Sequence, residues 1–429
     1  MSTTPPAPPS STSTPPDDVP RPLPERPDLR HLKLQARDLL KSGAAKSVAD
    51  AQFKIARTYG FPSWPKLKQH VELLGDTGEL KAAIDTNNFE RVKELMTRNP
   101  ALHQAPIGYN KNGPLTWVAE CRVPREAPGP VRLAMAQWMI DHGSDIHQGG
   151  DGPLMRASMP EYRIPMMELL VKNGADVNAL WNGNYPIIFT PCECLAPKSL
   201  QWLLDHGSDP RAIASQYGSP LAMLVGTYSR DADGKHDCLA VFERFGLTLP
   251  DTPPMAFHRG RLDELERHLQ RDPRLFARQW SETEIFPPEI GMKPGDGMSL
   301  TDPVGGTLLH LAMEYDDLKT AVWLLDHGAD PNARAAVSAA GFGGHTPLFH
   351  AVLHYGGDAA KARLLLERGA DPNARATIRK QLKDMGDPEK EKMFEFHDVT
   401  PIGFARKFQE PRWVNAEALK LIADAGGTA

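Results

Sequence analysis

Apolar and polar positions alternate along most of the chain with the period of short amphipathic helices. Apolar pairs such as Leu203-Leu204 and Leu324-Leu325 close such stretches, and a glycine, Gly207 or Gly328, follows within a few residues. Glycine takes positive φ at low cost, so a glycine at this place predicts the end of a helix. The spacing of the apolar positions therefore predicts an all-α protein built from short helices.

Two short phrases recur in phase with these predicted helices. The first combines an apolar pair, a few polar residues, glycine, alanine or serine, and aspartate, and it occupies residues 139–145, 169–176, 203–209, 324–330 and 365–371. Its first three glycines, Gly143, Gly174 and Gly207, lie 31 and 33 residues apart. The second phrase begins at Thr307, Thr346 and Thr400 and opens the next helix. Two phrases that recur at one period predict an array of helix pairs.

The two phrases together resemble the signature of ankyrin repeats. Residues 346–351 read Thr-Pro-Leu-Phe-His-Ala and are similar to the Thr-Pro-Leu-His-x-Ala sequence of that family, and His310 stands at the family histidine position. The resemblance covers residues 78–427 and points to bacterial ankyrin-repeat proteins. It implies an ankyrin-repeat α-solenoid of helix-turn-helix repeats with hairpin fingers, in blocks at 78–252 and 253–427. It also implies a non-catalytic scaffold that binds a protein partner with its concave face.

The residues before the repeats differ from them in composition. Residues 1–27 contain ten prolines and few apolar side chains, which predicts a disordered tail. Residues 28–74 predict three short helices with nine basic and four acidic side chains, a net charge of about +5. This unit resembles a small helical module at the N-terminus of some bacterial ankyrin-repeat proteins. Its charge keeps open a second function, that of a nucleic-acid-associated regulator.

Overall charge and segment lengths limit where the chain acts. The formal net charge of −5 gives no general attraction to nucleic acid or to an anionic membrane. No stretch approaches the ~18 uninterrupted apolar residues of a membrane span. The N-terminus lacks the basic and apolar regions of a secretory signal. A cytoplasmic protein is expected, monomeric by default because nothing in the sequence specifies an oligomer.

Residue types that carry chemistry do not form a recognisable catalytic or metal motif. Cys192 and Cys194 are the only close thiol pair and lack a second pair of zinc ligands. His350 and His354 are four residues apart on one predicted helix, but no third ligand is evident. No catalytic residue, cofactor or metal is therefore expected. An enzyme or metal protein with an unrecognised site stays open as a third possibility, for example in the insertion 278–305, and the role of the insertion 374–398 is also open.

Positions just after the conserved alanine of each first helix are expected to face the groove and to contact the partner. They are Trp117, Glu120, Arg156, Met159, His258, Arg259, Glu314, Tyr315, His350, His354, Phe404 and Lys407. Aromatic side chains and arginine are the types that most often anchor interfaces, although Trp117 and Phe404 could instead pack inside the array. In the best-matching repeat, His310 is expected to be buried and hydrogen-bonded, whereas Tyr315 is expected to be exposed.

Overall fold

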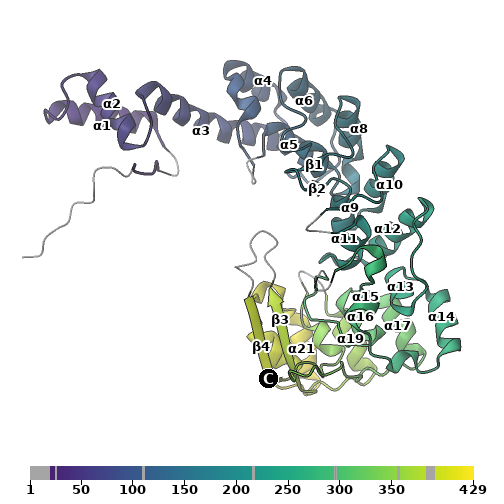
Figure 1. The fold of residues 1–429 in the computed structure, drawn as a ribbon. Helices are drawn as coiled ribbons and strands as arrows, with labels where there is room; N and C mark the ends of the chain where they lie inside the picture. Colours follow the sequence, from purple (N-terminus) through teal and green to yellow (C-terminus); the bar gives the residue numbers. More distant parts are fainter. Residues whose placement is uncertain are drawn as a thin grey trace, which may run out of the picture. The chain divides into compact units, whose positions relative to one another are not determined.

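The computed structural model describes residues 20–24, 27–108, 112–214, 218–293, 295, 297–354, 358–382 and 392–429. The described chain is mostly helical and divides into two compact units (Figure 1). The first unit contains residues up to 118 with 122–124 and 134–145, and the second contains 119–121, 125–133 and 146–429. The division falls inside the first predicted block of repeats rather than at 252/253. Most of the predicted disordered tail, residues 1–19 and 25–26, lies outside the described residues.

The first unit is built from consecutive helices. They are α1 (Leu29–Lys41), α2 (Val48–Thr58), α3 (Trp64–Asp85), α4 (Phe89–Arg98) and the 3-10 helix η1 (Pro100–Gln104), followed by α5 (Pro114–Glu120) and α6 (Pro130–Asp141), which the two units share. Helix α3 runs through Gly75 and Gly78, where the sequence predicted a break after position 74. A glycine inside a helix costs only about 1 kcal/mol. Burial of Leu80 and Ile84, in a helix that packs on α4, offsets that cost.

Residues 20–24 pack against the helical module instead of belonging to a free tail. The backbone N–H of Arg21 donates to the carbonyl oxygen of Thr58 at 2.8 Å. Leu23 packs against the buried cluster that contains Leu32 and Ala36. Pro20 lies close to Gly60, where a Cβ would come within 3.0 Å of it. The prediction of a disordered tail is therefore corrected for residues 20–24, which have defined contacts with the helical module.

A pair of truncations tests this correction. A chain that begins at Pro20 is expected to retain the thermal midpoint of the full chain. A chain that begins at Asp28 loses the Leu23 packing and the Arg21 hydrogen bond, which together contribute about 1–2 kcal/mol. Calorimetry of both chains measures the difference. Equal midpoints for the two truncated chains would show that residues 20–24 contribute nothing.

The second unit contains successive helix pairs with short strands between some of them. The helices are α7 (Gly152–Ala157), α8 (Ile164–Lys172), α9 (Phe189–Cys194), α10 (Pro197–Asp205), α11 (Pro220–Gly226), α12 (Ala232–Arg244), α13 (Pro253–His258), α14 (Leu262–Arg271), α15 (Glu282–Ile285), α16 (Leu308–Glu314), α17 (Leu318–Asp326), α18 (Leu348–Ala351), α19 (Ala360–Glu367), α20 (Pro401–Lys407) and α21 (Ala416–Asp424). Single 3-10 turns are η3 (Glu161–Arg163), η4 (Leu275–Ala277), η5 (Pro288–Ile290) and η7 (Pro411–Trp413).

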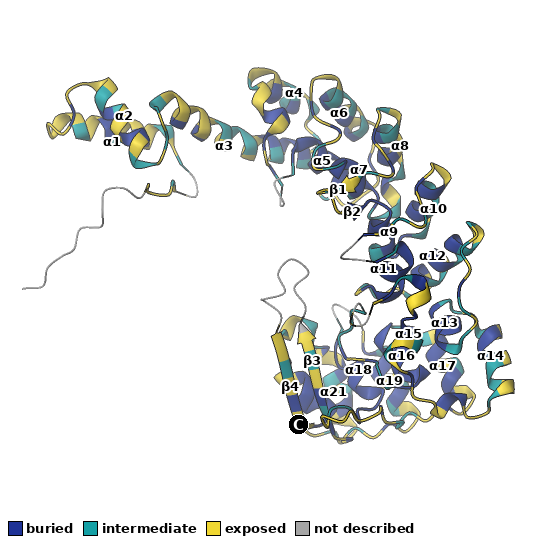
Figure 2. Ribbon diagram, viewed as in Figure 1, coloured by how far each residue is buried: buried dark blue, intermediate teal, exposed yellow. Residues whose placement is uncertain are grey.

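Neighbouring helix pairs stack side by side. The first helices of neighbouring pairs contact each other, and so do the second helices. Among the first helices, α9 contacts α11, α13 contacts α16, and α18 contacts both α16 and α20. Among the second helices, α10 contacts α12, and α19 contacts both α17 and α21. The buried side chains of these pairs form one continuous apolar cluster from Tyr185 to Ile422 (Figure 2). Each pair thus covers the apolar face of its neighbour, which a single pair could not bury alone.

Two antiparallel hairpins interrupt the helical pattern. Strands β1 (Leu180–Trp181) and β2 (Tyr185–Pro186) pair in the connection between α8 and α9. Strands β3 (Ala376–Leu382) and β4 (Lys392–Val399) form a longer hairpin within the insertion 374–398, with Lys380 opposite Phe394. An isolated bridge between Gly343 and Thr377 places the loop between α17 and α18 beside β3. The described part of the insertion 374–398 therefore forms an antiparallel hairpin.

Asparagines of the Asp-x-Asn turns connect neighbouring repeats. The Nδ2 of Asn178 donates to the carbonyl oxygen of Gly207 at 2.9 Å, and its Oδ1 accepts from the N–H of Asp209 at 2.8 Å. Asn332 makes the same pair of bonds to Gly369 and Asp371. Asp176 bonds within its own turn, to the N–H of Asn178 at 2.8 Å. The aspartate thus stabilises its own turn, and the asparagine forms hydrogen bonds with the backbone of the next repeat.

Several second helices are followed by a histidine that makes two contacts with the tryptophan four residues before it. The His206 ring stacks on Trp202 with centroids 3.7 Å apart, and its Nδ1 bonds to the Trp202 carbonyl oxygen at 2.7 Å. The pairs Trp138–His142 and Trp323–His327 repeat this arrangement. After α8 an asparagine, Asn173, takes this position, and its Nδ2 donates to the carbonyl oxygen of Leu169 at 2.8 Å.

Substitutions at His206 separate the two contacts. His206→Ala removes both and is expected to lower the free energy of unfolding by about 1 kcal/mol. His206→Asn keeps the hydrogen bond, as Asn173 does, and should lose about half as much. Denaturant midpoints measure both values. If the alanine and asparagine variants were equally unstable, the hydrogen bond would contribute nothing at this helix end.

Candidate functional site

The positions expected to face the groove divide into a buried and an accessible set. Seven are buried, contrary to the expectation of an exposed surface: Trp117, Glu120, His258, Glu314, Tyr315, His350 and Phe404. Five are at least partly exposed: Arg156, Met159, Arg259, His354 and Lys407. Partner contact stays a prediction for the accessible five. For the buried seven an exposed surface is excluded, because segments distant in sequence cover these helix ends.

Trp117 and Phe404 illustrate how the buried positions are covered. The Nε1 of Trp117 donates to Asp85 Oδ1 at 2.8 Å, and Lys81 Nζ lies 4.0 Å from the ring. The Phe404 ring packs edge-on against Phe396 of β4, with centroids 4.9 Å apart. The alternative that these two side chains pack inside the protein is the correct one.

Tyr315 lies beside basic side chains from the loop after α11 and from α12. It is 2% exposed, with Arg230 Cζ at 4.8 Å and Lys235 Nζ at 3.8 Å from its ring. The ring of His258 meets it edge-on at 5.5 Å. The prediction that Tyr315 faces the groove is therefore wrong. The residue is the C-cap of α16, and side chains from the α11–α12 loop, α12 and α13 pack against its ring.

Glu314 is the centre of a buried charge network. Its Oε1 lies 2.7 Å from Arg230 Nη2 and its Oε2 lies 2.9 Å from His350 Nδ1. Burial by itself would raise the pKa of this carboxyl, but Arg230 and His350 together hold it well below its ordinary value. The carboxylate therefore stays charged inside the protein, which only paired donors make tolerable.

Three buried histidines lie beside this carboxylate. The rings of His310, His345 and His350 are 5.2 to 5.7 Å apart, centroid to centroid. His310 is buried as predicted: its Nδ1 contacts Thr307 N at 3.0 Å, and its Nε2 bonds to the carbonyl oxygen of His345 at 3.1 Å. Burial, followed by the charge of His350, lowers the pKa of His310 to about 3. This imidazole is thus neutral in the folded protein.

The residues considered for metal binding do not converge. His350 turns to Glu314, whereas His354 Nδ1 pairs with Asp316 Oδ2 at 2.5 Å. Burial raises the pKa of the Cys194 thiol to about 12, so the nucleophilic thiolate is disfavoured there. Among the described residues, no group of three or more histidines, cysteines and carboxylates has the geometry to hold a metal ion.

Accessible arginine, methionine and aromatic side chains lie on α7, the loop after it, the β1–β2 hairpin and the loop after α11. Glu193 links Tyr228 to Tyr185, and the Tyr185 ring meets Trp181 edge-on. We call Arg156, Met159, Tyr162, Trp181 and Tyr228 the arginine–aromatic surface. Arg156 Nη1 contacts Met159 Sδ at 3.6 Å, and its Cζ lies 5.9 Å from the Trp181 ring. Tyr228 is 58% exposed and interacts with Glu193. Only Arg156 and Met159 were expected from sequence, because the three aromatic residues lie outside the repeated phrases.

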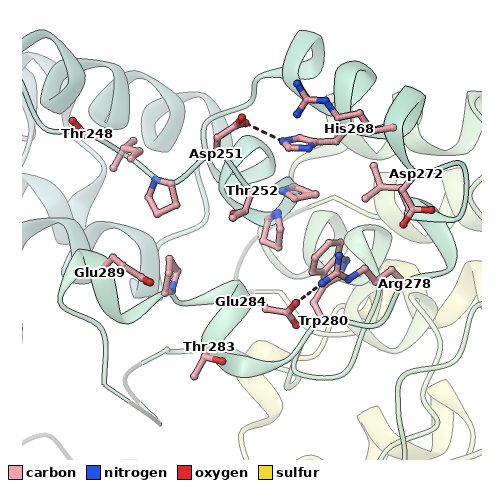
Figure 3. A pocket seen from close by; sticks show the side chains of 17 residues that line it. Thr248, Asp251, Thr252, His268, Asp272, Arg278, Trp280, Thr283, Glu284 and Glu289 are labelled. Atoms are coloured by element: carbon pink, nitrogen blue, oxygen red, sulfur yellow. Dashed lines mark hydrogen bonds and ion pairs between the residues drawn. The ribbon is translucent and has the colours of Figure 1, made fainter.

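A cavity of about 740 Å³ lies between the segment 248–254, the end of α14 and the segment 275–289 (Figure 3). Arg278 Cζ lies 4.1 Å from the Trp280 ring, and its Nη2 pairs with Glu284 at 2.5 Å (Figure 3). On another wall, His268 Nε2 lies 3.1 Å from Asp251 Oδ1. Two basic groups of the cavity wall, Arg278 and His268, are thus each paired with a carboxylate of the same wall.

The comparisons with known proteins support the repeat assignment for part of the chain. No helix among the described residues combines the length and apolar character of a bilayer span. A search of curated proteins finds no match. Residues 290–376 match the family model described as ankyrin repeats (3 copies), and this chain therefore contains ankyrin repeats in that region.

Proposed function

We propose that this chain is a non-catalytic scaffold, an ankyrin-repeat α-solenoid that binds a protein partner with the inner face of its second unit. Ankyrin repeats generally act as protein–protein interaction modules, and the family match covers residues 290–376. The observation that carries the proposal is the arginine–aromatic surface. Tryptophan, tyrosine and arginine are the side chains that most often dominate binding energy when a partner covers them.

The arrangement of this surface suits a partner that packs against aromatic faces. Arg163 Nη1 donates to the Arg156 carbonyl oxygen at 2.7 Å, and its Cζ lies 5.4 Å from the Tyr162 ring. These contacts hold the loop after α7 in place before a partner arrives. A preorganised surface loses less conformational entropy on binding than a flexible one.

Site-specific photocrosslinking tests the proposal. A benzoylphenylalanine in place of Tyr228 is expected to crosslink one protein in cells that produce this chain. The same group in place of Val322, an exposed residue on the second helix α17, provides the control and should give no specific adduct.

Quantitative capture of that protein then tests the individual side chains. Tyr228→Ala and Arg156→Ala should each reduce its capture at least about fivefold, the effect of an interface residue that contributes 1 kcal/mol or more. Val322→Ala should leave capture unchanged. Unchanged capture in all three variants would refute a partner site at this surface.

The other predictions about this chain stay predictions. Binding of nucleic acid by the basic module 28–74 and an unrecognised enzymatic or metal site stay alternatives, with no specific contact in their favour. The cytoplasmic location, the monomeric state and the relation to bacterial ankyrin-repeat proteins stay predictions.

A further inference from the structure

Four residues of the insertion 278–305 cross the ends of several first helices in the second unit. We call residues 298–301, Met-Ser-Leu-Thr, the strap. The N–H of Met298 donates to the carbonyl oxygen of Gly226, the last residue of α11, at 2.9 Å. The carbonyl oxygen of Met298 accepts from Arg230 Nη2 at 3.2 Å. Both backbone groups of one strap residue are therefore bound by the first helix α11 and the loop after it.

The next three strap residues are bound by elements of later repeats. The N–H groups of Leu300 and Thr301 donate to the two carboxylate oxygens of Glu314, at 2.6 and 3.1 Å. Lys380 Nζ, on β3, donates to the carbonyl oxygen of Ser299. Side chains from three separate elements thus contact backbone groups of four consecutive residues.

These contacts recognise a backbone rather than a particular sequence. All the strap groups that Arg230, Glu314 and Lys380 bind are peptide N–H and C=O groups, which any extended peptide offers. The side chains of Arg230 and Glu314 are only 7% and 2% exposed and pair with each other at 2.7 Å, so the strap groups add hydrogen bonds to charges that are already paired. Arg230 is also fixed by the carbonyl oxygen of Thr227 at 2.9 Å, so the arginine is oriented independently of the strap.

We propose that Arg230, Glu314 and Lys380 form a binding site for the backbone of an extended peptide. In this chain the strap occupies that site as an intramolecular ligand. An external peptide of similar composition binds only when the strap leaves. This inference goes beyond the proposed function, because it assigns a second site, a ligand class and a competing segment.

Proline substitutions in the strap release it without changing the site. The double variant Leu300→Pro/Thr301→Pro lacks both N–H groups that Glu314 accepts. The matched control Leu300→Ala/Thr301→Ala loses the same side chains but keeps both N–H groups. A fluorescein-labelled peptide of residues 297–304, Gly-Met-Ser-Leu-Thr-Asp-Pro-Val, is the probe, and fluorescence anisotropy measures its binding.

The probe is expected to bind the proline variant at least about tenfold more tightly than the wild-type chain or the alanine control, because a tethered strap competes at high effective concentration. Adding Glu314→Gln to the proline variant should weaken binding of the probe at least about tenfold, because one of the two carboxylate acceptors is lost. A folded proline variant that fails to bind the probe would overturn the inference.

Hydrogen exchange of the wild-type chain decides the question if the proline variant does not fold. Excess unlabelled peptide is expected to raise deuterium uptake across residues 297–302 at least about twofold, since it displaces the strap. The same peptide with proline in place of Leu300 and Thr301 should not, because it lacks the two N–H groups that Glu314 accepts. Unchanged uptake with both peptides would refute the inference. The crosslinking test measures partner binding at Tyr228 and not peptide binding at Glu314, so failure here would leave the proposed function unaffected.

Discussion

Tyr315→Ala is expected to lower the free energy of unfolding of the second unit by about 3–5 kcal/mol. The ring is almost fully buried and fills the space between Arg230, Lys235 and His258. Its removal leaves a cavity, and both basic side chains lose the aromatic face above which they lie. Denaturant titration followed by circular dichroism measures the change. A loss within about 0.5 kcal/mol, as for a surface residue, would mean that the ring is solvent-exposed after all.

Tyr315→Phe is the matched control for this prediction. The Tyr315 hydroxyl is buried and makes no hydrogen bond with any residue that the structure describes. Removing an unsatisfied buried hydroxyl costs nothing and can stabilise a protein. We therefore expect the phenylalanine variant to match or exceed the stability of the wild-type chain. If it unfolds as easily as the alanine variant, the hydroxyl has a partner and the packing explanation is incomplete.

Acidification from pH 7.5 to 5.5 is expected to remove about 4 kcal/mol from the stability of the second unit. Burial lowers the pKa of His258, His310 and His345, so these three imidazoles are neutral in the folded protein. In the unfolded chain each takes up a proton below about pH 6.5. The unfolded state therefore binds more protons, and stability is complete above that pH and falls as the pH drops through it.

His345→Phe tests the origin of this acid sensitivity. The substitution removes one of the three protons, so the loss between pH 7.5 and 5.5 should shrink by about a third. Carboxyl groups such as Glu314 and Asp317 also have lowered pKa values, but unfolded carboxyls take up protons only near pH 4. A loss of stability confined to pH below about 4.5 would assign it to the carboxyls rather than to the histidines.

The local elements of this chain follow from its sequence alone. The phrase from Leu324 to Asp330 predicts where α17 ends, because glycine and the preceding apolar pair specify a helix end within one turn. The burial of His310 was predicted in the same way. Each depends on contacts between residues close in sequence, or on a position that recurs in every repeat.

Only the tertiary structure decided which helix ends remain accessible. Glu314 occupies a groove position by its place in the repeat, but the strap, which belongs to an irregular insertion, covers it. Phe404 is covered by a hairpin that no repeat period predicts. Likewise Trp181 and Tyr228 join Arg156 from segments dozens of residues apart. Periodicity determines which face of a helix is apolar, whereas accessibility depends on contacts between distant segments, and these form only when the whole chain packs.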